Sequence, residues 1–200
     1  MLEFLDIVDE NGEPTGKTVE RKKAHAEGIR HRTSHVWLAR KRNGRVEILM
    51  QKRAENKDSY PGCYDISSAG HIPAGDGFEE SAVRELREEL GVKADEGELI
   101  YCGDRNVQWD DVFSGKPFHD NQFSRVFLLW RNTEEDQFTL QKEELESVKW
   151  IPFDECVDGV LNNKFKNCIA TDELMILKKG IEKTERMFSD ENGKYRQKDK

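Results

Sequence analysis

The alternation of apolar and polar residues along the chain predicts short strands, three helices and a tight hairpin. Strand-like runs lie at residues 3–8, 36–40, 46–52, 99–102, 123–131 and 148–151. Helical spacing lies at residues 78–90, 153–161 and 173–188. Asn43 and Gly44 separate two strand-like runs and predict a hairpin, because such a turn requires positive φ. We therefore expect one α+β domain over residues 1–189, followed by a frayed polar tail over residues 190–200.

The helix expected over residues 78–90 has the clearest pattern. Its apolar positions repeat at helical spacing: Ala82, Val83, Leu86 and Leu90. Asp76 and Glu79 have the spacing of a capping box, and Gly91 stands where a helix commonly ends. The pattern therefore predicts both ends of this helix as well as its buried face.

A polar stretch between two expected strands contains three aromatic residues, Trp109, Phe113 and Phe118. The absence of apolar alternation predicts a loop there. The aromatic rings of such a loop could stack on a base, cover an apolar group, or pack against the edge of the sheet.

Charge and hydropathy exclude several classes of protein. The 200 residues include 32 Lys and Arg against 40 Asp and Glu, which gives a net charge of −8 with neutral histidines. A chain of this charge is a poor ligand for nucleic acid polymers and anionic membranes, but local cations or a metal ion can still attract a small anion. The longest apolar run, Val126–Trp130, is far shorter than the ~20 residues that a membrane span needs.

The first residues and the cysteines both indicate an intracellular protein. The chain starts with an acidic segment and has no apolar signal sequence. Its four cysteines are far apart, without a C-x-x-C motif. We therefore expect free thiols and a cytoplasmic location.

Three carboxylates share one edge of the helix at residues 78–90. At about 100° per residue, Glu85, Glu88 and Glu89 fall within one sector next to the apolar face. Like charges at this spacing repel each other by roughly 0.2–0.5 kcal/mol per pair, and a divalent cation would turn that repulsion into binding. Hard oxygen ligands favour Mg²⁺ or Mn²⁺. The alternative is a solvated acidic face with Arg84 and Arg87 as local counterions.

The surrounding segment resembles the Nudix box, G-x5-E-x7-R-E-U-x-E-E-x-G-U, in which U is a bulky apolar residue. The residues that match its fixed positions are Gly70, Arg84, Glu85, Leu86, Glu88, Glu89, Gly91 and Val92. The one departure is Asp76, which replaces the first glutamate of the pattern. The length and order of the match make the resemblance specific.

The resemblance implies a Nudix fold, a mixed β-sheet sandwiched between helices, and hydrolysis of a diphosphate linkage. Glu85, Glu88 and Glu89 would bind Mg²⁺ or Mn²⁺, together with the carbonyl of Gly70. Arg84 would hold the carboxylates in place. Bound cations neutralise charge on phosphate and acidify the attacking water. Glu88 or Glu89 is the expected proton acceptor.

The chain from about residue 6 to residue 155 also resembles isopentenyl-diphosphate isomerase, a Nudix relative. The shared residues include Pro14, Thr15, Gly16, Ala24, His25, His31, Trp37, Leu38, Lys52, Arg53, Ala54, Pro61, Gly62, Gly70 and His71. By this resemblance His25, His31 and His71 would help to bind a divalent metal. Arg21, Arg53 and Lys57 would contact the diphosphate, and His71 also lies in this substrate region.

Two positions separate the chain from the isomerases. Where they have a cysteine and a glutamate for proton transfer, this chain has Ala69 and Gln122. Neither side chain is a useful acid or base. The hydrolytic box glutamates are present, so we favour a hydrolase over the isomerase alternative. A third alternative is a non-catalytic nucleotide-sensing module, but such modules usually have decayed box carboxylates.

The group attached to the diphosphate is not predicted by these motifs. Nucleoside diphosphate sugars, dinucleotides, damaged nucleotides, cofactor diphosphates and prenyl diphosphates all stay open. The expected partner is a small-molecule diphosphate, with no nucleic acid polymer and no membrane. Many Nudix proteins are dimers, so a homodimer also stays open.

Overall fold

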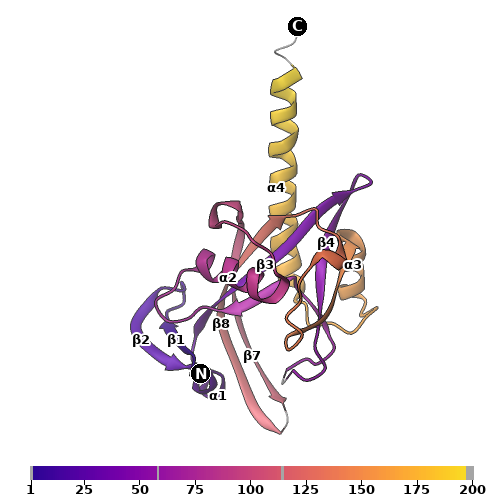
Figure 1. Ribbon diagram of the computed structural model, residues 1–200. Coiled ribbons are helices and arrows are strands. Elements are labelled where there is room, and N and C mark those ends of the chain that lie inside the picture. Colours follow the sequence, from indigo (N-terminus) through magenta and orange to yellow (C-terminus); the bar gives the residue numbers. More distant parts are fainter. Residues whose placement is uncertain (1, 58, 114, 197–200) are drawn as a thin grey trace.

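The computed structural model describes residues 2–57, 59–113 and 115–196 (Figure 1). The helices are α1 (Arg21–Glu27), α2 (Phe78–Leu90), α3 (Phe153–Leu161) and α4 (Thr171–Arg196), with 3₁₀ turns at Glu96–Glu98 and Glu135–Gln137. The strands are β1 (Phe4–Val8), β2 (Pro14–Glu20), β3 (His31–Arg42), β4 (Arg45–Arg53), β5 (Tyr64–Asp65), β6 (Ser68–His71), β7 (Ile100–Phe113), β8 (Lys116–Trp130) and β9 (Leu145–Pro152). Among these described residues, no helix combines the length and apolar character that a membrane span requires.

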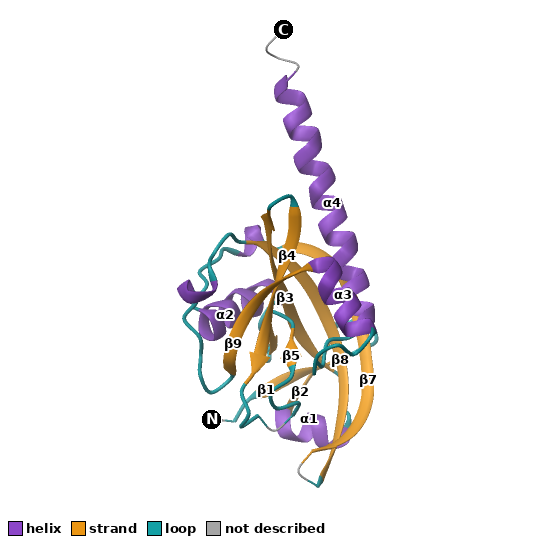
Figure 2. Ribbon diagram, turned by 90° about the vertical axis from the view of Figure 1, so that its right-hand side faces the viewer, coloured by secondary structure: helices purple, strands orange, loops and turns teal. Residues whose placement is uncertain are grey.

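The strands form a small sheet, β1-β2, and a seven-stranded sheet. The larger sheet has the order β5-β4-β3-β8-β7, with β6 also paired to β3 and β9 to β4. It is mixed, because β3 and β8 run parallel while the other pairs are antiparallel. Figure 2 shows α2 on one side of this sheet and α3 with α4 on the other. The predicted α+β sandwich is thus confirmed.

Both faces of β3 are covered, because its alternating side chains enter two different apolar clusters. Val36 and Leu38 pack in the cluster that contains Leu86 and Leu90 of α2. Trp37 and Ala39 pack in the cluster with residues of α3 and α4. A strand that is buried on both faces needs an almost continuous apolar run, and residues 36–39 provide it.

Strand β3 changes its partner along its length, and this change shapes the sheet. Residues 33–36 of β3 pair with β6, whereas residues 39–42 pair with β4. The Ser67 side chain joins the diverging strands: its oxygen accepts from the Leu38 amide at 2.8 Å, and its hydroxyl donates to the Leu49 carbonyl at 2.6 Å. The sheet therefore splits at this point, next to the C-terminal half of α2.

Most of the predicted elements are confirmed. Helices α2 and α3 have the predicted bounds, and Asn43 and Gly44 form the predicted turn with φ values of 52° and 77°. Gly91 ends α2 in the left-handed region, with a φ of 69°. The predicted cap was wrong by one residue at each position: Gly77 is the N-cap, and its N–H donates to the Glu80 carboxylate at 3.5 Å.

Three regions differ from the prediction. Strand β2 and helix α1 were not predicted, because their buried positions are few: only Val19 in β2, and Ala24 and His25 in α1. The stretch predicted as an aromatic loop forms the distal part of the β7–β8 hairpin, which projects from the sheet at the end opposite to α4 (Figure 1). Helix α4 continues beyond residue 188 to Arg196, and residues 197–200 of the predicted tail lie outside the described residues.

Candidate functional site

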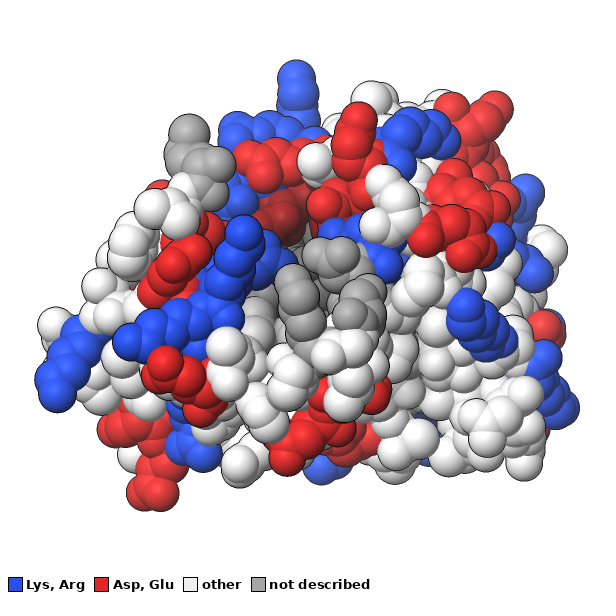
Figure 3. Space-filling view, turned by 90° about the horizontal axis from the view of Figure 1, so that it is seen from below, with Lys and Arg blue, Asp and Glu red and all other residues white. Residues whose placement is uncertain are grey.

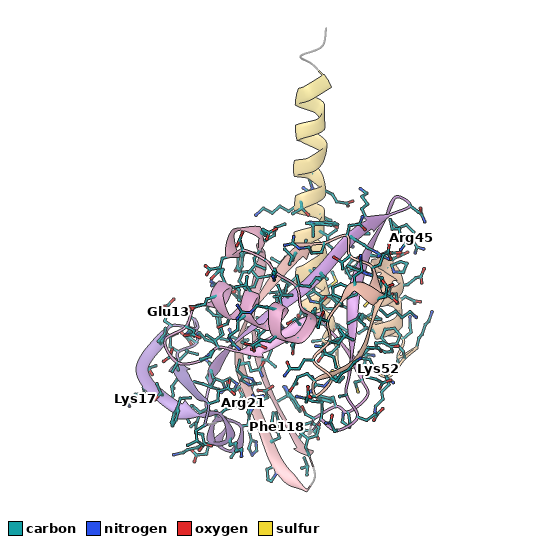
Figure 4. All side chains as sticks on the ribbon, viewed as in Figure 1. Glu13, Lys17, Arg21, Arg45, Lys52 and Phe118 are labelled. Carbon is teal, nitrogen blue, oxygen red and sulfur yellow. The ribbon has the colours of Figure 1, made fainter. Side chains whose placement is uncertain are left out.

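A cavity of about 1320 Å³ lies on the face of the sheet opposite to the apolar side of α2. Residues of α1, β3, β6, the β7–β8 hairpin, the segment after β4 and the start of α4 surround it. Figure 4 shows Arg21 and Phe118, which both line the cavity, on the side of the molecule where α1 and the hairpin meet. Seen from that side, Lys and Arg are interspersed with Asp and Glu and form no extended patch of one sign (Figure 3).

The box helix contributes one buried carboxylate to this cavity. Glu89 is 7% exposed, lines the cavity, and accepts a hydrogen bond from the Ser68 hydroxyl at 2.6 Å. Within the described part of the chain, no basic group forms an ion pair with it. Burial raises the pKa of Glu89 to about 8, with further raising by the charges of Glu85 and Glu144. A carboxylate in this state is a strong ligand for a cation, because a cation supplies the positive charge that the protein omits.

Glu85 lies against the backbone of β6 at Gly70, where a Cβ would have to displace the Glu85 side chain. A Cβ on Gly70 would lie 2.2 Å from Cδ of Glu85. Burial raises the pKa of Glu85, and this rise is opposed by Arg84, which lies 2.9 Å away. The Arg84 guanidinium also donates to the His71 carbonyl at 3.3 Å and so holds α2 to β6. Gly70 and Arg84 therefore both lie beside Glu85, and their roles at the site stay predictions.

Glu88 differs from the other two box glutamates. Its side chain is 49% exposed, lies 3.4 Å from Arg84, and is not among the residues that line the cavity. The three carboxylates are thus graded from buried to exposed along one edge of α2. Glu89, not Glu88, is the box carboxylate that faces the cavity.

The structure brings together three histidines that are far apart in the sequence. The metal-binding ring atoms of His25, His31 and His71 all lie within 4.8 Å of one another, and the Nε2 atoms of His25 and His71 are 3.0 Å apart. Burial lowers the pKa of His25 to about 3 and also lowers the pKa values of His31 and His71. The three imidazoles are therefore neutral, which is the form that binds a metal.

Unpaired polar atoms converge on the same cluster. Among the described residues, Nε2 of His31, Nδ1 of His25 and Oδ1 of Asp120 are buried without a hydrogen-bond partner. The last two of these atoms lie 3.6 Å apart. Buried polar atoms without partners are costly, so three of them in and beside this cluster make its residues candidate metal ligands. Imidazole and carboxylate donors together suit a divalent transition metal.

The basic residues predicted to contact the substrate all line the cavity, each with an internal partner. Arg21 is 47% exposed and pairs with Glu3 at 2.9 Å. Arg53 donates to the Ser59 carbonyl and pairs with Asp65 at 3.2 Å. Lys57 pairs with Glu144. Their positive charges thus belong to the lining of the cavity.

Several cavity residues were not predicted from the sequence as site residues. They are Thr33, His35, Tyr60, Arg105, Asp120 and Glu173. A signal was present for two of them: His31, Thr33 and His35 alternate along a strand, and alternate residues share one face. The expected strand began only at residue 36, so this alternation was not used.

The two positions that distinguish the chain from the isomerases also lie at the cavity. Ala69 faces His35 across the β3–β6 ladder, and Gln122 faces His31 across the β3–β8 ladder. The Gln122 amide donates to Asp120 at 2.9 Å and accepts from Thr33 at 3.3 Å. Its hydrogen bonds are those of a neutral amide, which transfers no proton.

The sequence comparisons agree with the geometry of this site. The NUDIX domain family matches residues 29–170, which include the box and most of the cavity. The chain belongs to the Nudix hydrolase family. Nudix hydrolase 3 of Arabidopsis thaliana is 42% identical over 157 residues, which are 76% of this chain but only 20% of that protein. An uncharacterized Nudix hydrolase of Clostridium acetobutylicum is 36% identical over 168 residues, covering 84% of this chain and 78% of that one.

Solved structures share the Nudix fold at low sequence identity. The Deinococcus radiodurans protein DR0079 matches with a TM-score of 0.63 and 17% identity, covering 88% of this chain and 98% of that chain. A MutT protein of Methanosarcina mazei matches with a TM-score of 0.54 and 15% identity, covering 77% of this chain and 95% of that chain. At this identity the likeness concerns the fold alone. The resemblance to the isomerase branch stays a prediction.

Proposed function

We propose that this Nudix protein hydrolyses the diphosphate linkage of a small organic diphosphate with the help of a divalent cation. The observation that carries the proposal is the buried Glu89 carboxylate, which faces the cavity without a basic partner among the described residues. A cavity of about 1320 Å³ suits a small molecule. The negative net charge argues against a nucleic acid polymer as the substrate.

Glu85, Glu88, Glu89 and the carbonyl of Gly70 are the groups that would hold Mg²⁺ or Mn²⁺. When bound, such a cation neutralises the phosphate oxygens and acidifies a water molecule. The close fit of Glu85 on Gly70 supports this ligand set, because it keeps that carboxylate beside the carbonyl. Arg84 would set the direction of Glu85 and Glu88, since it lies within ion-pair distance of both.

Arg21, Arg53, Lys57 and His71 are the groups that would contact the diphosphate. Arg53 ends β4, Lys57 follows this strand, Arg21 begins α1, and all three line the cavity. Charge-assisted hydrogen bonds from guanidinium and ammonium groups are the strongest contacts that phosphate makes in proteins. Because Arg53 and Lys57 have carboxylate partners in the protein, the substrate would share or replace those contacts.

His25, His31 and His71 are candidate ligands for a second divalent ion, and Asp120 is a fourth candidate. The three unpaired buried atoms of this cluster support the assignment. Its neutral nitrogen donors differ from the box oxygens, so the two places would prefer different metals.

A hydrolysis screen tests the proposal. The protein is incubated with UDP-glucose, ADP-ribose, NADH, FAD, an oxidised deoxyguanosine diphosphate and isopentenyl diphosphate, each with Mg²⁺ or Mn²⁺. We expect release of phosphate or a monophosphate from at least one compound, and its loss when EDTA is added. A nucleotide that binds tightly with metal and stays intact would indicate a sensing module instead. A cytoplasmic location and a homodimer stay predictions from the sequence.

A further inference from the structure

We propose that His35 is the proton acceptor for the attacking water in this cavity, and that Glu173 of α4 positions it. The inference rests on the proposed hydrolysis and deepens it, because it names the residue that takes the proton. Neither residue belongs to the Nudix box. Glu173 fixes the imidazole of His35 by a hydrogen bond, and His35 lines the same cavity as Glu89.

Glu173 is a buried carboxylate that fixes the imidazole of His35. It is 2% exposed and accepts hydrogen bonds from Nδ1 of His35 at 3.0 Å, from Nε1 of Trp37 at 3.0 Å and from Arg105 at 3.0 Å. Burial alone would raise the pKa of Glu173, but these partners outweigh it and keep the pKa below its ordinary value. The group is therefore ionised. Since a carboxylate only accepts, Nδ1 of His35 must carry the hydrogen.

The other nitrogen of His35 is consequently the basic one. His35 lines the cavity, and the protein group beside its Nε2 is the Thr33 hydroxyl at 3.3 Å. That hydroxyl has one hydrogen and a closer acceptor, Oγ of Ser124, at 2.8 Å. The Nε2 lone pair is thus available to a water molecule or ligand in the cavity.

His35 lines the same cavity as the box carboxylate Glu89. His35 lies directly opposite Ala69 in the ladder. The two neighbours of Ala69 in β6 face the other side of the sheet: Ser68 donates to Glu89 at 2.6 Å, and Gly70 packs against Glu85. Of these two carboxylates, Glu89 also lines the cavity that His35 lines. Side chains opposite each other in a ladder have Cβ atoms about 4.5–5.5 Å apart. The methyl group of Ala69 leaves room there for water and a phosphate group.

A proton acceptor that is not a metal ligand avoids the loss of basicity that a bound cation causes. A carboxylate that holds a divalent cation becomes a weaker base, because the positive charge stabilises its ionised form. An imidazole backed by a buried carboxylate gains basicity, since the carboxylate stabilises the imidazolium that forms. Other polar residues that line the same cavity are Arg105, Asp120, His71 and Gln122.

The proposed step balances as follows. Water forms a bond to phosphorus and gives one proton to Nε2 of His35, while the bridging P–O bond breaks and the leaving phosphate keeps the electron pair. Glu173 balances the charge of the imidazolium. His35 then returns the proton to solvent as the products leave. Water, His35 and Glu173 thus take the roles of nucleophile, base and orienting carboxylate.

The test compares His35→Gln and Glu173→Gln with a matched control, His119→Gln. His119 also pairs with a carboxylate, Asp110, at 2.7 Å, but it is 40% exposed. With the compound that the screen turns over fastest, we expect His35→Gln to lower kcat by about 10²-fold or more with KM little changed. Glu173→Gln lowers kcat by at least about ten-fold, and His119→Gln leaves it unchanged.

Two further readouts separate catalysis from a structural role. In Glu173→Gln the loss should lie in kcat with KM little changed, as expected when a positioning group for the base is removed. Added imidazole should restore activity to His35→Ala. Circular dichroism and thermal unfolding of each variant verify its fold, so that lost activity is not mistaken for lost structure.

The outcomes distinguish this inference from the proposed function. A wild-type protein that hydrolyses no compound in the screen overturns the proposed function. A kcat of the wild-type level in His35→Gln overturns only the assignment of His35. Independently of turnover, ¹⁵N NMR of the histidines in the wild-type protein should show hydrogen on Nδ1 of His35, and magnesium with inorganic pyrophosphate should shift its Nε2 signal. Hydrogen on Nε2, or no shift, contradicts the proposal.

Discussion

Two walls of the same cavity have opposite chemistry. The carboxylate wall consists of Glu85, Glu88 and Glu89 on one edge of α2, and of these Glu89 lines the cavity. The imidazole wall consists of His25, His31 and His71 from α1, β3 and β6, and of these His25 and His71 line the cavity. Burial acts on both, but in opposite directions. It raises the pKa of Glu89 to about 8 and lowers the pKa of His25 to about 3. Burial thus drives both Glu89 and His25 toward their neutral forms.

The two walls therefore differ in how they can bind a metal ion. A protonated carboxyl must lose its proton before it can bind a cation, so its binding is coupled to pH. A neutral imidazole already presents its lone pair. The two walls should therefore respond differently to substitution, to metal type and to pH, and each response can test the comparison.

The largest expected effect is on turnover. We expect Glu89→Gln to lower kcat by about 10²-fold to 10³-fold, because the variant removes the buried carboxylate that faces the cavity. The control is Glu182→Gln, which changes an exposed glutamate of α4 (47% exposed) and should have no effect. Undiminished turnover in Glu89→Gln, measured with Mg²⁺ at saturating substrate, would remove the carboxylate wall from the mechanism.

The next effect concerns metal affinity. His71→Ala should weaken Mn²⁺ or Zn²⁺ binding at the imidazole wall by at least about ten-fold, because it removes a candidate ligand. Mg²⁺ binding at the carboxylate wall should change little, since Mg²⁺ prefers oxygen ligands. Calorimetric titration with each metal measures both affinities. Equal loss of both metals would mean that the two walls form a single site.

A third effect is on stability. Gly70→Ala should destabilise the protein by about 1–3 kcal/mol, because overpacking costs this much and the new Cβ would lie 2.2 Å from Cδ of Glu85. Gly97→Ala is the control, since a Cβ there meets nothing within 4 Å. Urea unfolding of both variants measures the difference. An unchanged free energy of unfolding in Gly70→Ala would show that Glu85 moves away freely.

The smallest effect concerns how the stability of the metal-free protein depends on pH. Because the folded-state pKa of Glu89 is about 8 against an ordinary value of 4.5, the folded state loses stability as the pH rises from 4.5 to 8. Glu89→Gln should therefore unfold at a higher temperature than the wild type at pH 9, with little difference at pH 4. Each kcal/mol corresponds to about 2–4 °C for a chain of this size. Glu88→Gln, at an exposed position, should show no such difference.

The imidazole wall should show the opposite dependence. The folded-state pKa of His25 is about 3 against an ordinary value of 6.5, so its neutral form adds stability above pH 6.5 that is lost as the pH falls toward 3. His25→Gln should accordingly lose less stability on acidification than the wild type. Thermal unfolding at pH 7 and pH 4 measures this, and equal losses in both proteins would contradict it.

The carboxylate wall could be predicted from sequence, and the imidazole wall could not be derived from it. Glu85, Glu88 and Glu89 lie within two turns of one helix, so the helical period alone brings them together. His25, His31 and His71 meet only because β3 pairs with β6 and α1 packs beside them. The sequence supplied these histidines only through resemblance to a relative. Long-range pairing of this kind leaves no local pattern.

The same reasoning explains the other differences. The distal part of the β7–β8 hairpin projects beyond the core, so residues such as Asp111 and Val112 stay exposed and show no apolar alternation. Glu173 was expected only as the start of a helix, because nothing local marks its contact with His35. The burial of such a polar group can be recognised only from the packing of α4 against β3.

Alternate residues of β3 pack in the core and line the cavity. Ser34 and Val36 turn toward α2, while Thr33 and His35 line the cavity on the opposite face. One extra residue inserted before Thr33 would exchange the two sets, placing an imidazole among the apolar side chains of α2 and a valine in the cavity. The packing of the core and the chemistry of the cavity therefore depend on the same register of β3. A shift of this strand by one residue would disrupt both.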